Sequence, residues 1–570
     1  MAVQVSRIRR TAGQQASAAH GLPPRASPPR RRFAPLRGWD WGALALAALA
    51  ALPILAIVVA APAGGMEALV HMAGSVLPRY VLNTSALMGL TGALAGAIGV
   101  GCAWLVTAAD FPGRRILGWA LVMPLAVPAY IAAYIYADLL DYAGPLQSAL
   151  RAAFGEGAGA LVPQVRSLPG GAFVLGIVLY PYVYLLSRAA FAAQSLAQFR
   201  AARSLGASPA RAFWRIALPA ARPAIAGGLA LVLMEVLADF GVAEYYAIPT
   251  FSTGIFRSWL AMGDKQAALK LAAIMLVFVI ALVAFEASTR SGRSDSRDGR
   301  ARDGAPLIEL SRTGRALACL ACALPVVLGF VVPALHLAGL ATSEAALAAA
   351  RNLPAHAADS LRLGLATALA CLAAALLLAF ARRRSASPLV GGAIRLATLG
   401  YALPGALLAV GLLAPLGALD IALTRFARDT LGHAPGGLLL TGTSIVLIYA
   451  LSVRFLTVAY NSVESGLATV PANLDAAARS LGAGPGRVLA RIHAPLLAPS
   501  LGAAAALVFI DTLRELPATL ILRPFNLETL ATRTYRLASD ERLAEASIPA
   551  LILLAAGILP VILLHRTARR

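Results

Sequence analysis

Two pairs of acidic residues stand at matching positions in two long apolar stretches of the chain. Glu235 and Asp239 lie four residues apart in the first stretch, and Asp511 and Glu515 repeat this spacing in the second. A spacing of four puts two side chains on one face of a helix. A carboxylate in an apolar segment is costly in free energy unless it faces a charge, water or the interior of a helix bundle. The pairs therefore predict either the acidic lining of a pathway for a cation, or internal partners for polar groups such as Arg514.

The two pairs follow a segment that the chain contains twice. Residues 201–228 read AARSLGASPARAFWRIALPAARPAIAGG, and residues 477–504 read AARSLGAGPGRVLARIHAPLLAPSLGAA, so each residue of the first copy corresponds to the one 276 positions later. The same offset relates Pro128 to Pro404, each of which lies in a long apolar run. An internal repeat on this scale indicates a chain built from two related halves.

Composition restricts the class of protein that can contain these repeats. The 570-residue chain is 59% hydrophobic and 13% charged, and its mean hydropathy is +0.74. These values exclude a soluble globular protein of this length, and the Leu- and Ala-rich runs are long enough for helices that cross a membrane, which takes roughly 20 residues. The formal charge of +22 comes from arginines that stand between apolar runs. There they set the topology and contact anionic headgroups, so the lipid bilayer is an expected partner and nucleic acid is not.

The apolar runs predict an all-α, polytopic membrane protein with about twelve transmembrane helices in two parallel six-helix repeats. The first set comprises residues 41–61, 81–108, 116–140, 172–193, 223–246 and 268–287. The second set comprises residues 314–340, 357–381, 390–416, 437–460, 497–522 and 546–565. An even number of helices per half gives both halves the same orientation, related by an axis along the membrane normal, and a pathway is expected at their interface.

These runs divide the chain into four parts. Residues 1–38 form a basic N-terminal extension that we expect to be disordered, residues 39–288 the first half, residues 289–312 a hydrophilic cytoplasmic linker, and residues 313–570 the second half. Arginines cluster in the linker and in both repeated segments, and the positive-inside rule places these on the cytoplasmic side. Both chain termini are then expected in the cytoplasm.

The repeated segment resembles the signature loop of the permease subunits of bacterial ABC importers, whose pattern is E-A-A-x3-G-x9-I-x-L-P. In that family the loop docks in a groove of the ATPase subunit, so the resemblance implies two ATPase-coupling loops here. The first comprises Arg200, Ala201, Ala202, Gly206, Ile216, Leu218 and Pro219. The second comprises Asp475, Ala477, Ala478, Gly482, Ile492 and Pro495. Arg200 and Ala476 replace the glutamate of the pattern, which removes its usual acidic contact from both loops, and Ala494 replaces the leucine in the second.

The residues of the loops indicate the same role without the resemblance. Gly206 and Gly482 can adopt positive φ in a turn, and Pro209 and Pro485 are suited to the first position of a following helix. A helix, a glycine turn and a second helix would form a rigid lever on the cytoplasmic face. The alternative is an ordinary basic loop between helices, which two copies at a fixed spacing argue against.

Longer segments resemble the fused two-half permeases of the iron(III) ABC importer family, over about residues 40–567. They are residues 77–90, 122–147, 178–191, 239–259 and 515–543. The resemblance implies a permease of the bacterial inner membrane that takes ferric iron from an extracytoplasmic substrate-binding protein and passes it to the cytoplasm by alternating access. A homodimeric ABC ATPase subunit would supply the energy.

Several alternatives remain open at this point. Thiamine, aminophosphonate or a polyamine is a possible cargo within the same class, since related permeases share much of the pattern. A twelve-helix secondary transporter driven by an ion gradient, or a membrane enzyme, would be a different class. The sequence contains no GxxxxGK[ST] phosphate loop and no recognisable catalytic or metal-ligand motif, so we expect no enzymatic activity, metal or cofactor on this chain.

A group of tyrosines offers a second kind of candidate site. Its members are Tyr130, Tyr134, Tyr136, Tyr180, Tyr182 and Tyr184. A phenolate is a good ligand for iron(III), but aromatic residues are also common at membrane interfaces and in packing. The sequence favours packing.

Overall fold

The computed structural model describes residues 38–62, 65–194, 204–290, 308–385, 387–431 and 438–569. Within these residues the regular structure is helical, and one isolated bridge joins Ala109 and Ile308. The predicted all-α class is confirmed. The N-terminal extension, most of the linker, and the positions Arg200, Ala201 and Ala202 of the first coupling loop lie outside the described residues.

The helices form two series of the same order. The first series is α2 (Gly38–Ala60), α3 (Gly65–Gly74), α4 (Leu77–Ala108), α5 (Arg114–Ala120), α6 (Ala129–Leu140), α7 (Pro145–Phe154), α8 (Leu168–Ala193), α10 (Pro209–Ala212), α11 (Leu218–Ala238), α12 (Gly241–Tyr245), α13 (Phe251–Phe256) and α14 (Lys265–Arg290). The second series is α15 (Arg312–Val326), α16 (Val332–Leu340), α17 (Glu344–Ala349), α18 (Leu353–Arg384), α19 (Pro388–Ala397), α20 (Gly405–Leu431), α21 (Ser444–Ala468), α22 (Ala472–Ser480), α23 (Pro485–Val488), α24 (Ala494–Leu496), α25 (Ala498–Arg514), α26 (Pro517–Leu522), α27 (Leu530–Ser539) and α28 (Leu543–Arg569).

The duplication extends to individual hydrogen bonds. α4 and α18 have the same length and begin 276 residues apart, at Leu77 and Leu353, and α10 and α23 are each followed by a π-helical segment. The hydroxyl of Thr84 accepts a hydrogen bond of 3.3 Å from the backbone N–H at the start of α13. The hydroxyl of Ser360 accepts the equivalent bond of 2.8 Å at the start of α27. The two series therefore share one backbone plan.

The protein is polytopic, as predicted, but the count of twelve membrane spans is not confirmed. Among the described residues, nine helices are long and apolar enough to cross a membrane, and counting each of two bent pairs as one span gives eleven. α28 adds a shorter apolar stretch at Leu543–Leu559.

Two predicted spans, 116–140 and 390–416, are broken at equivalent positions. The residues that precede Pro128 and Pro404 are extended, with ψ of 118° and 123°. A proline disfavours the helical conformation of the residue before it. In the first half the chain bends by 91° at this break.

The predicted spans 223–246 and 497–522 also differ from the structure. α11 and α25 end early because Asp239 and Glu515, the next residues, are extended with ψ of 131° and 127°. After each of them the chain enters a short helix, α12 or α26. This pair of breaks places the acidic residues at helix ends.

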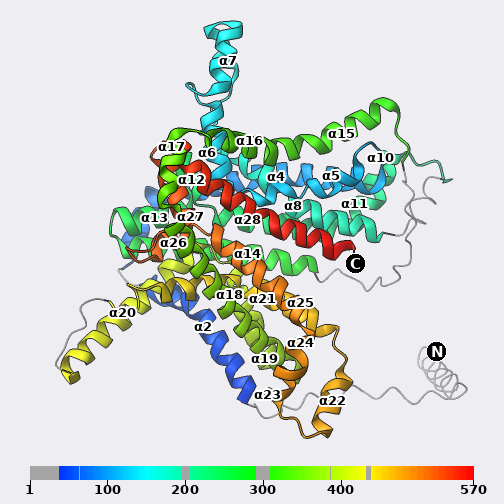
Figure 1. Cartoon of the computed structure of the whole chain (residues 1–570). Helices are drawn as coiled ribbons and strands as arrows, with labels where there is room; N and C mark the ends of the chain where they lie inside the picture. The colour runs from blue at the N-terminus through cyan, green and yellow to red at the C-terminus, as the bar shows by residue number, and fades with distance from the viewer. Residues whose placement is uncertain are drawn as a thin grey trace, which may run out of the picture.

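The first long helix of each series packs against the other series. α2 lies against α18, α19 and α20, while α15 lies against α4 and α5, and α16 lies against α6. A Cβ atom at Gly411 of α20 would come within 2.6 Å of the carbonyl oxygen of Pro53 in α2, so the crossing requires glycine. The halves are interlocked. In Figure 1 the helices form two arms, each with helices of both halves, that meet near α12, α13, α26 and α27 and diverge toward α10 and α23.

Helices α4 and α8 cross at Gly99. A Cβ atom there would lie 2.7 Å from the Cβ of Val183 and 2.9 Å from the backbone nitrogen of Tyr184. Small residues allow membrane helices to approach closely. The equivalent residue of α18 is Ala375, which is fully buried.

We expect Gly99→Val to destabilise the protein by about 1–3 kcal/mol, because extra atoms in a tight crossing force the backbones apart. Gly101→Val is the matched control, since a Cβ atom at Gly101 meets nothing within 4 Å. Thermal unfolding of the purified protein measures both. Equal melting temperatures for the two variants would contradict this account of the crossing.

Candidate functional site

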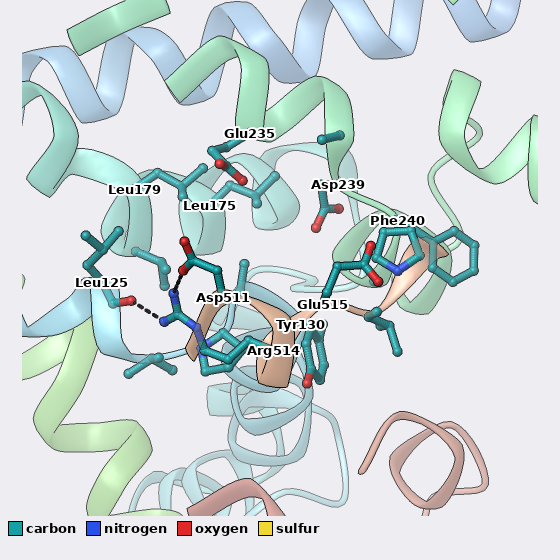
Figure 2. Close-up of a pocket in the computed structure, with 18 of the residues that line it drawn as sticks. Leu125, Tyr130, Leu175, Leu179, Glu235, Asp239, Phe240, Asp511, Arg514 and Glu515 are labelled. Carbon is teal, nitrogen blue, oxygen red and sulfur yellow. Dashed lines mark hydrogen bonds and ion pairs between the residues drawn. The ribbon is translucent and has the colours of Figure 1, made fainter. Parts of the chain in front are cut away.

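A cavity of about 170 Å³ lies between the two halves, at the ends of α11 and α25. All four carboxylates of the predicted pairs line it, namely Glu235, Asp239, Asp511 and Glu515, together with Arg454 and Arg514. In Figure 2 the acidic side chains of α11 lie across the cavity from those of α25, among apolar residues such as Leu175 and Leu179. The fold therefore brings together residues 276 positions apart in the sequence.

Asp239 and Glu515 are equivalent residues that cap the short helices after them. Asp239 Oδ2 accepts a hydrogen bond of 3.0 Å from the backbone N–H of Ala243. Glu515 accepts bonds of 2.9 and 3.0 Å from the N–H groups of Ala518 and Thr519. The first N–H groups of a helix have no partner within it, and negative charge is favoured there. These carboxylates therefore stabilise the breaks that end α11 and α25.

Glu515 also forms an ion pair with Arg454 of α21. The Nη1 and Oε1 atoms are 3.4 Å apart, and the two side chains are 12% and 2% exposed. Gly405 makes room for the pair, because a Cβ atom there would lie 2.5 Å from Glu515 Oε1 and 2.7 Å from Arg454 Nη1. The residue of α8 equivalent to Arg454 is Val178, so the first half has no counterpart to this cation.

Arg454 was not among the candidates that the sequence suggested. The sequence feature that could have identified Arg454 is its position as an arginine within the apolar run that forms α21. Charged residues in such runs usually face partners inside a bundle, and this one does.

Arg514 connects Asp511 to the first half of the chain. Its Nη2 lies 3.3 Å from Asp511 Oδ1, and its Nη1 donates a hydrogen bond of 2.8 Å to the carbonyl oxygen of Leu125 (Figure 2). Arg514 is therefore an internal partner for a carboxylate, as one of the two interpretations of the acidic pairs requires.

Glu235 differs from the other three carboxylates. Its Oε1 accepts a hydrogen bond of 3.2 Å from the hydroxyl of Tyr401, which comes from the second half. None of the ion pairs among the described residues includes Glu235, whereas its equivalent Asp511 is paired with Arg514. Asp239 likewise forms no ion pair and accepts hydrogen bonds from backbone N–H groups. Among the described residues, the two carboxylates of α11 are therefore the ones in the cavity without an ion pair, whereas both carboxylates of α25 have one.

Four carboxylates and two guanidinium groups line the cavity, which gives it a formal charge of −2 when all six are ionised. The interpretation as internal partners describes three of the carboxylates, since Asp239 and Glu515 cap helices and Asp511 is held by Arg514. A pathway role for the four residues stays a hypothesis.

The tyrosine group is mainly packed in the interior. Tyr134, Tyr180 and Tyr184 are at most 1% exposed, and the Tyr134 ring lies 4.4 Å from that of Tyr245. Tyr184 donates a hydrogen bond of 2.7 Å to the carbonyl oxygen of Gly118. In the part of the chain that the structure describes, no group of three or more His, Cys, Asp and Glu residues is arranged to hold a metal.

The two coupling loops contain the glycine turns that the sequence predicted. φ is +82° at Gly206 and +75° at Gly482, a region that favours glycine. Each turn leads to a short helix that begins with proline, α10 or α23. The leucine before each glycine is largely exposed, 88% at Leu205 and 87% at Leu481. Figure 1 shows α10 and α23 at the far ends of the two arms.

The remaining loop positions lie in the helices on either side of the turns. Ile216 and Ile492 lie in the π-helical segments, Leu218 and Pro219 begin α11, Pro495 lies in α24, and Ala477 and Ala478 lie in α22. Their contact with an ATPase stays a prediction.

Asp475 points into the protein. Its side chain is 22% exposed, and its two oxygens lie 2.7 Å from Nε of Arg383 and 2.6 Å from Nε2 of His493. Burial raises the pKa of Asp475, but the hydrogen bonds from Arg383 and His493 outweigh it and hold that pKa below its usual value. Asp475 is therefore not an exposed substitute for the glutamate missing at Ala476.

Part of the chain matches a known protein family. Residues 95–290 match the family of binding-protein-dependent transport system inner membrane components. The match runs from α4 to the end of α14 and includes the first coupling loop, Glu235 and Asp239. The matched residues thus include one of the two repeated loops and one of the two acidic pairs that line the cavity.

Individual relatives are similar to different lengths of the chain. The Fe(3+)-transport system permease protein FbpB 2 of Haemophilus influenzae is 24% identical over 497 residues, which cover 86% of this chain and 90% of the relative. A 2-aminoethylphosphonate permease of Salmonella typhimurium is 30% identical over 135 residues, covering 24% and 51%. The molybdenum permease ModB of Escherichia coli is 28% identical over 143 residues, covering 25% and 60%.

The equivalent carboxylates Asp239 and Glu515 should differ in their effect on stability. We expect Asp239→Ala to cost about 1 kcal/mol through the lost helix cap. Glu515→Ala should cost about 3 kcal/mol or more, because it also leaves the buried cation of Arg454 without its partner. Thermal unfolding in detergent measures both variants. Equal losses of stability would show that the ion pair between Arg454 and Glu515 does not stabilise the protein.

Proposed function

We propose that this chain forms the complete membrane pathway of an ATP-driven importer and that its cargo is ferric iron. The observation that carries the proposal is the cavity where equivalent ends of α11 and α25 bring four carboxylates together. The interface between two parallel repeats is where a transport pathway is expected. The ferric-iron relative, similar over 86% of the chain, supports the choice of cargo.

A separate, homodimeric ATPase would supply the energy. The chain itself contains no P-loop. Two loops with equivalent glycine turns at the ends of two arms suit a partner that offers two equivalent sites (Figure 1). An extracytoplasmic binding protein would deliver the cargo on the opposite face, with both chain termini in the cytoplasm.

The arrangement of the arms supports alternating access. The arms meet near α12, α13, α26 and α27 and are far apart at the coupling loops (Figure 1), as expected when the pathway is closed on its outer side. ATP binding would draw the two loops together and open the outer side to the binding protein. Hydrolysis would then return the arms to the present arrangement.

The charges around the cavity favour a cation over an oxyanion. An oxyanion needs free guanidinium groups, but Arg454 is paired with Glu515, and Arg514 is engaged with Asp511 and a backbone carbonyl. The carboxylates that form no ion pair among the described residues are Glu235 and Asp239, both at the end of α11, and Glu235 also accepts a hydrogen bond from the second half. Carboxylate oxygens suit hard cations.

Glu235→Gln should reduce uptake of ferric iron by about tenfold, the cost of one charge-assisted contact. The measurement is uptake of labelled ferric iron by proteoliposomes that contain the ATPase and the cargo-loaded binding protein. Glu344→Gln, at an exposed position of α17, is the matched control and should transport normally.

Uptake at the wild-type rate by correctly inserted Glu235→Gln would contradict the pathway hypothesis. Uptake of thiamine, an aminophosphonate or a polyamine in place of iron would change the cargo and keep the class. Uptake driven by a proton gradient without the ATPase would establish a secondary transporter instead.

The coupling loops make a separate prediction. Proline fixes φ near −65°, so Gly206→Pro cannot keep the turn observed at +82°. We expect ATP hydrolysis by the assembled complex to continue while transport per ATP falls by about tenfold. Gly486→Ala is the control, because a Cβ atom there meets nothing within 4 Å. A normal ratio of transport to ATP hydrolysis in Gly206→Pro would argue against the hypothesis that the coupling loop acts as a rigid lever.

A further inference from the structure

The second coupling loop is tied to the membrane helices by one arginine. Arg383, near the end of α18, donates hydrogen bonds of 2.9, 3.0 and 3.2 Å to the carbonyl oxygens of Leu467, Val470 and Pro471. These carbonyls lie at the end of α21 and in the turn that leads to α22. The last carbonyl groups of a helix have no hydrogen-bond partner within the helix and carry partial negative charge. A positively charged guanidinium group is therefore stabilised at this position.

The same guanidinium group also holds the loop helix itself. Its Nε lies 2.7 Å from Oδ2 of Asp475, in the first turn of α22. The other oxygen of Asp475 accepts a hydrogen bond of 2.6 Å from His493, which is fully buried in the π-helical segment before α24. Asp475 therefore joins the helix before the glycine turn to the segment after it and to α18.

The side chains of this network are replaced in the first half. The residues that correspond to Arg383, Asp475 and His493 are Thr107, Phe199 and Ala217, none of which can carry a charge. Thr107 donates its hydroxyl hydrogen bond to its own helix, and the carbonyl oxygen of Ala217 accepts a neutral hydrogen bond of 2.9 Å from Gln194. Aromatic rings occupy this region of the first half. Trp104 lies 5.4 Å from Phe191 and 5.0 Å from Phe213, centroid to centroid.

We propose that Arg383 is a positioning residue that makes the second coupling loop move as one body with α18 and α21. The two loops are then inequivalent, since only the second half has charged side chains at these three positions, although aromatic rings pack beside both loops. Side chains of Arg383 and Asp475 are 16% and 22% exposed, so water does little to screen the network, and bonds to charged groups are stronger than neutral ones. The inference rests on the proposed coupling function of the loops.

The network should slow the opening of the loop backbone, which hydrogen exchange of the full-length permease in nanodiscs measures directly. In Arg383→Gln and in Asp475→Asn we expect residues 473–481 to exchange about tenfold faster, with residues 204–217 of the first loop unchanged. Arg383→Lys keeps the charge but not the planar fork and should give an intermediate rate. Arg382→Gln removes an exposed arginine from the same helix end and should leave exchange unchanged.

The second measurement uses the same variants in the complete complex with its ATPase. Transport per ATP hydrolysed should fall about fivefold or more in Arg383→Gln and stay normal in Arg382→Gln. Unchanged exchange in Arg383→Gln would overturn the proposal. Faster exchange in Arg383→Gln with normal transport per ATP would show that Arg383 stabilises the loop without affecting coupling. That result would also overturn the proposal. If Arg383→Gln exchanges faster but the wild-type complex shows no ATP-dependent transport, the attachment of the loop through Arg383 would be supported and the proposed function overturned.

Discussion

Charged groups in an apolar interior must find partners, and this constraint determines where the helices of the protein break. α11 and α25 end where a carboxylate turns to cap the next short helix, at Asp239 and Glu515. Because the cap needs free N–H groups, each acidic residue requires a new helix start directly after it. The breaks direct the acidic ends of two helices toward one another, and the cavity between the halves is the result.

The two halves meet this constraint with different side chains on the same backbone plan. In the second half, Arg454 and Arg514 compensate carboxylates within the cavity, whereas Val178 and Ala238 occupy the equivalent positions in the first half. The coupling loops differ in the same way, since the charged network of the second has no ionisable residues at the equivalent positions of the first. A duplicated chain can diverge like this because each half needs to serve only one side of a shared interface. The cavity is accordingly lined by equivalent backbone segments and by an unequal distribution of charge.

Much of this architecture could be predicted from the sequence because it depends on local patterns. The offset of 276 residues relates α4 to α18, and the glycines of the coupling loops have the predicted turn. The broken spans were missed because apolar composition continues through Pro128 and Asp239, so only local backbone preferences mark the breaks. Arg383, Arg454 and His493 were missed as site residues because their partners lie far away in the sequence and are brought close by helix packing. The same long-range pairing explains why Asp475 is internal although its position in a basic loop suggested a surface.

The central claim is that ATP moves the two coupling loops relative to each other and thereby opens the cavity to alternate sides. The most direct test is the distance between spin labels at Leu205 and Leu481, which are exposed at equivalent turns, in the complex with its ATPase. The account predicts a shorter distance when ATP is bound and a return to the longer one after hydrolysis. A distance that does not respond to ATP but changes with a proton gradient would contradict it.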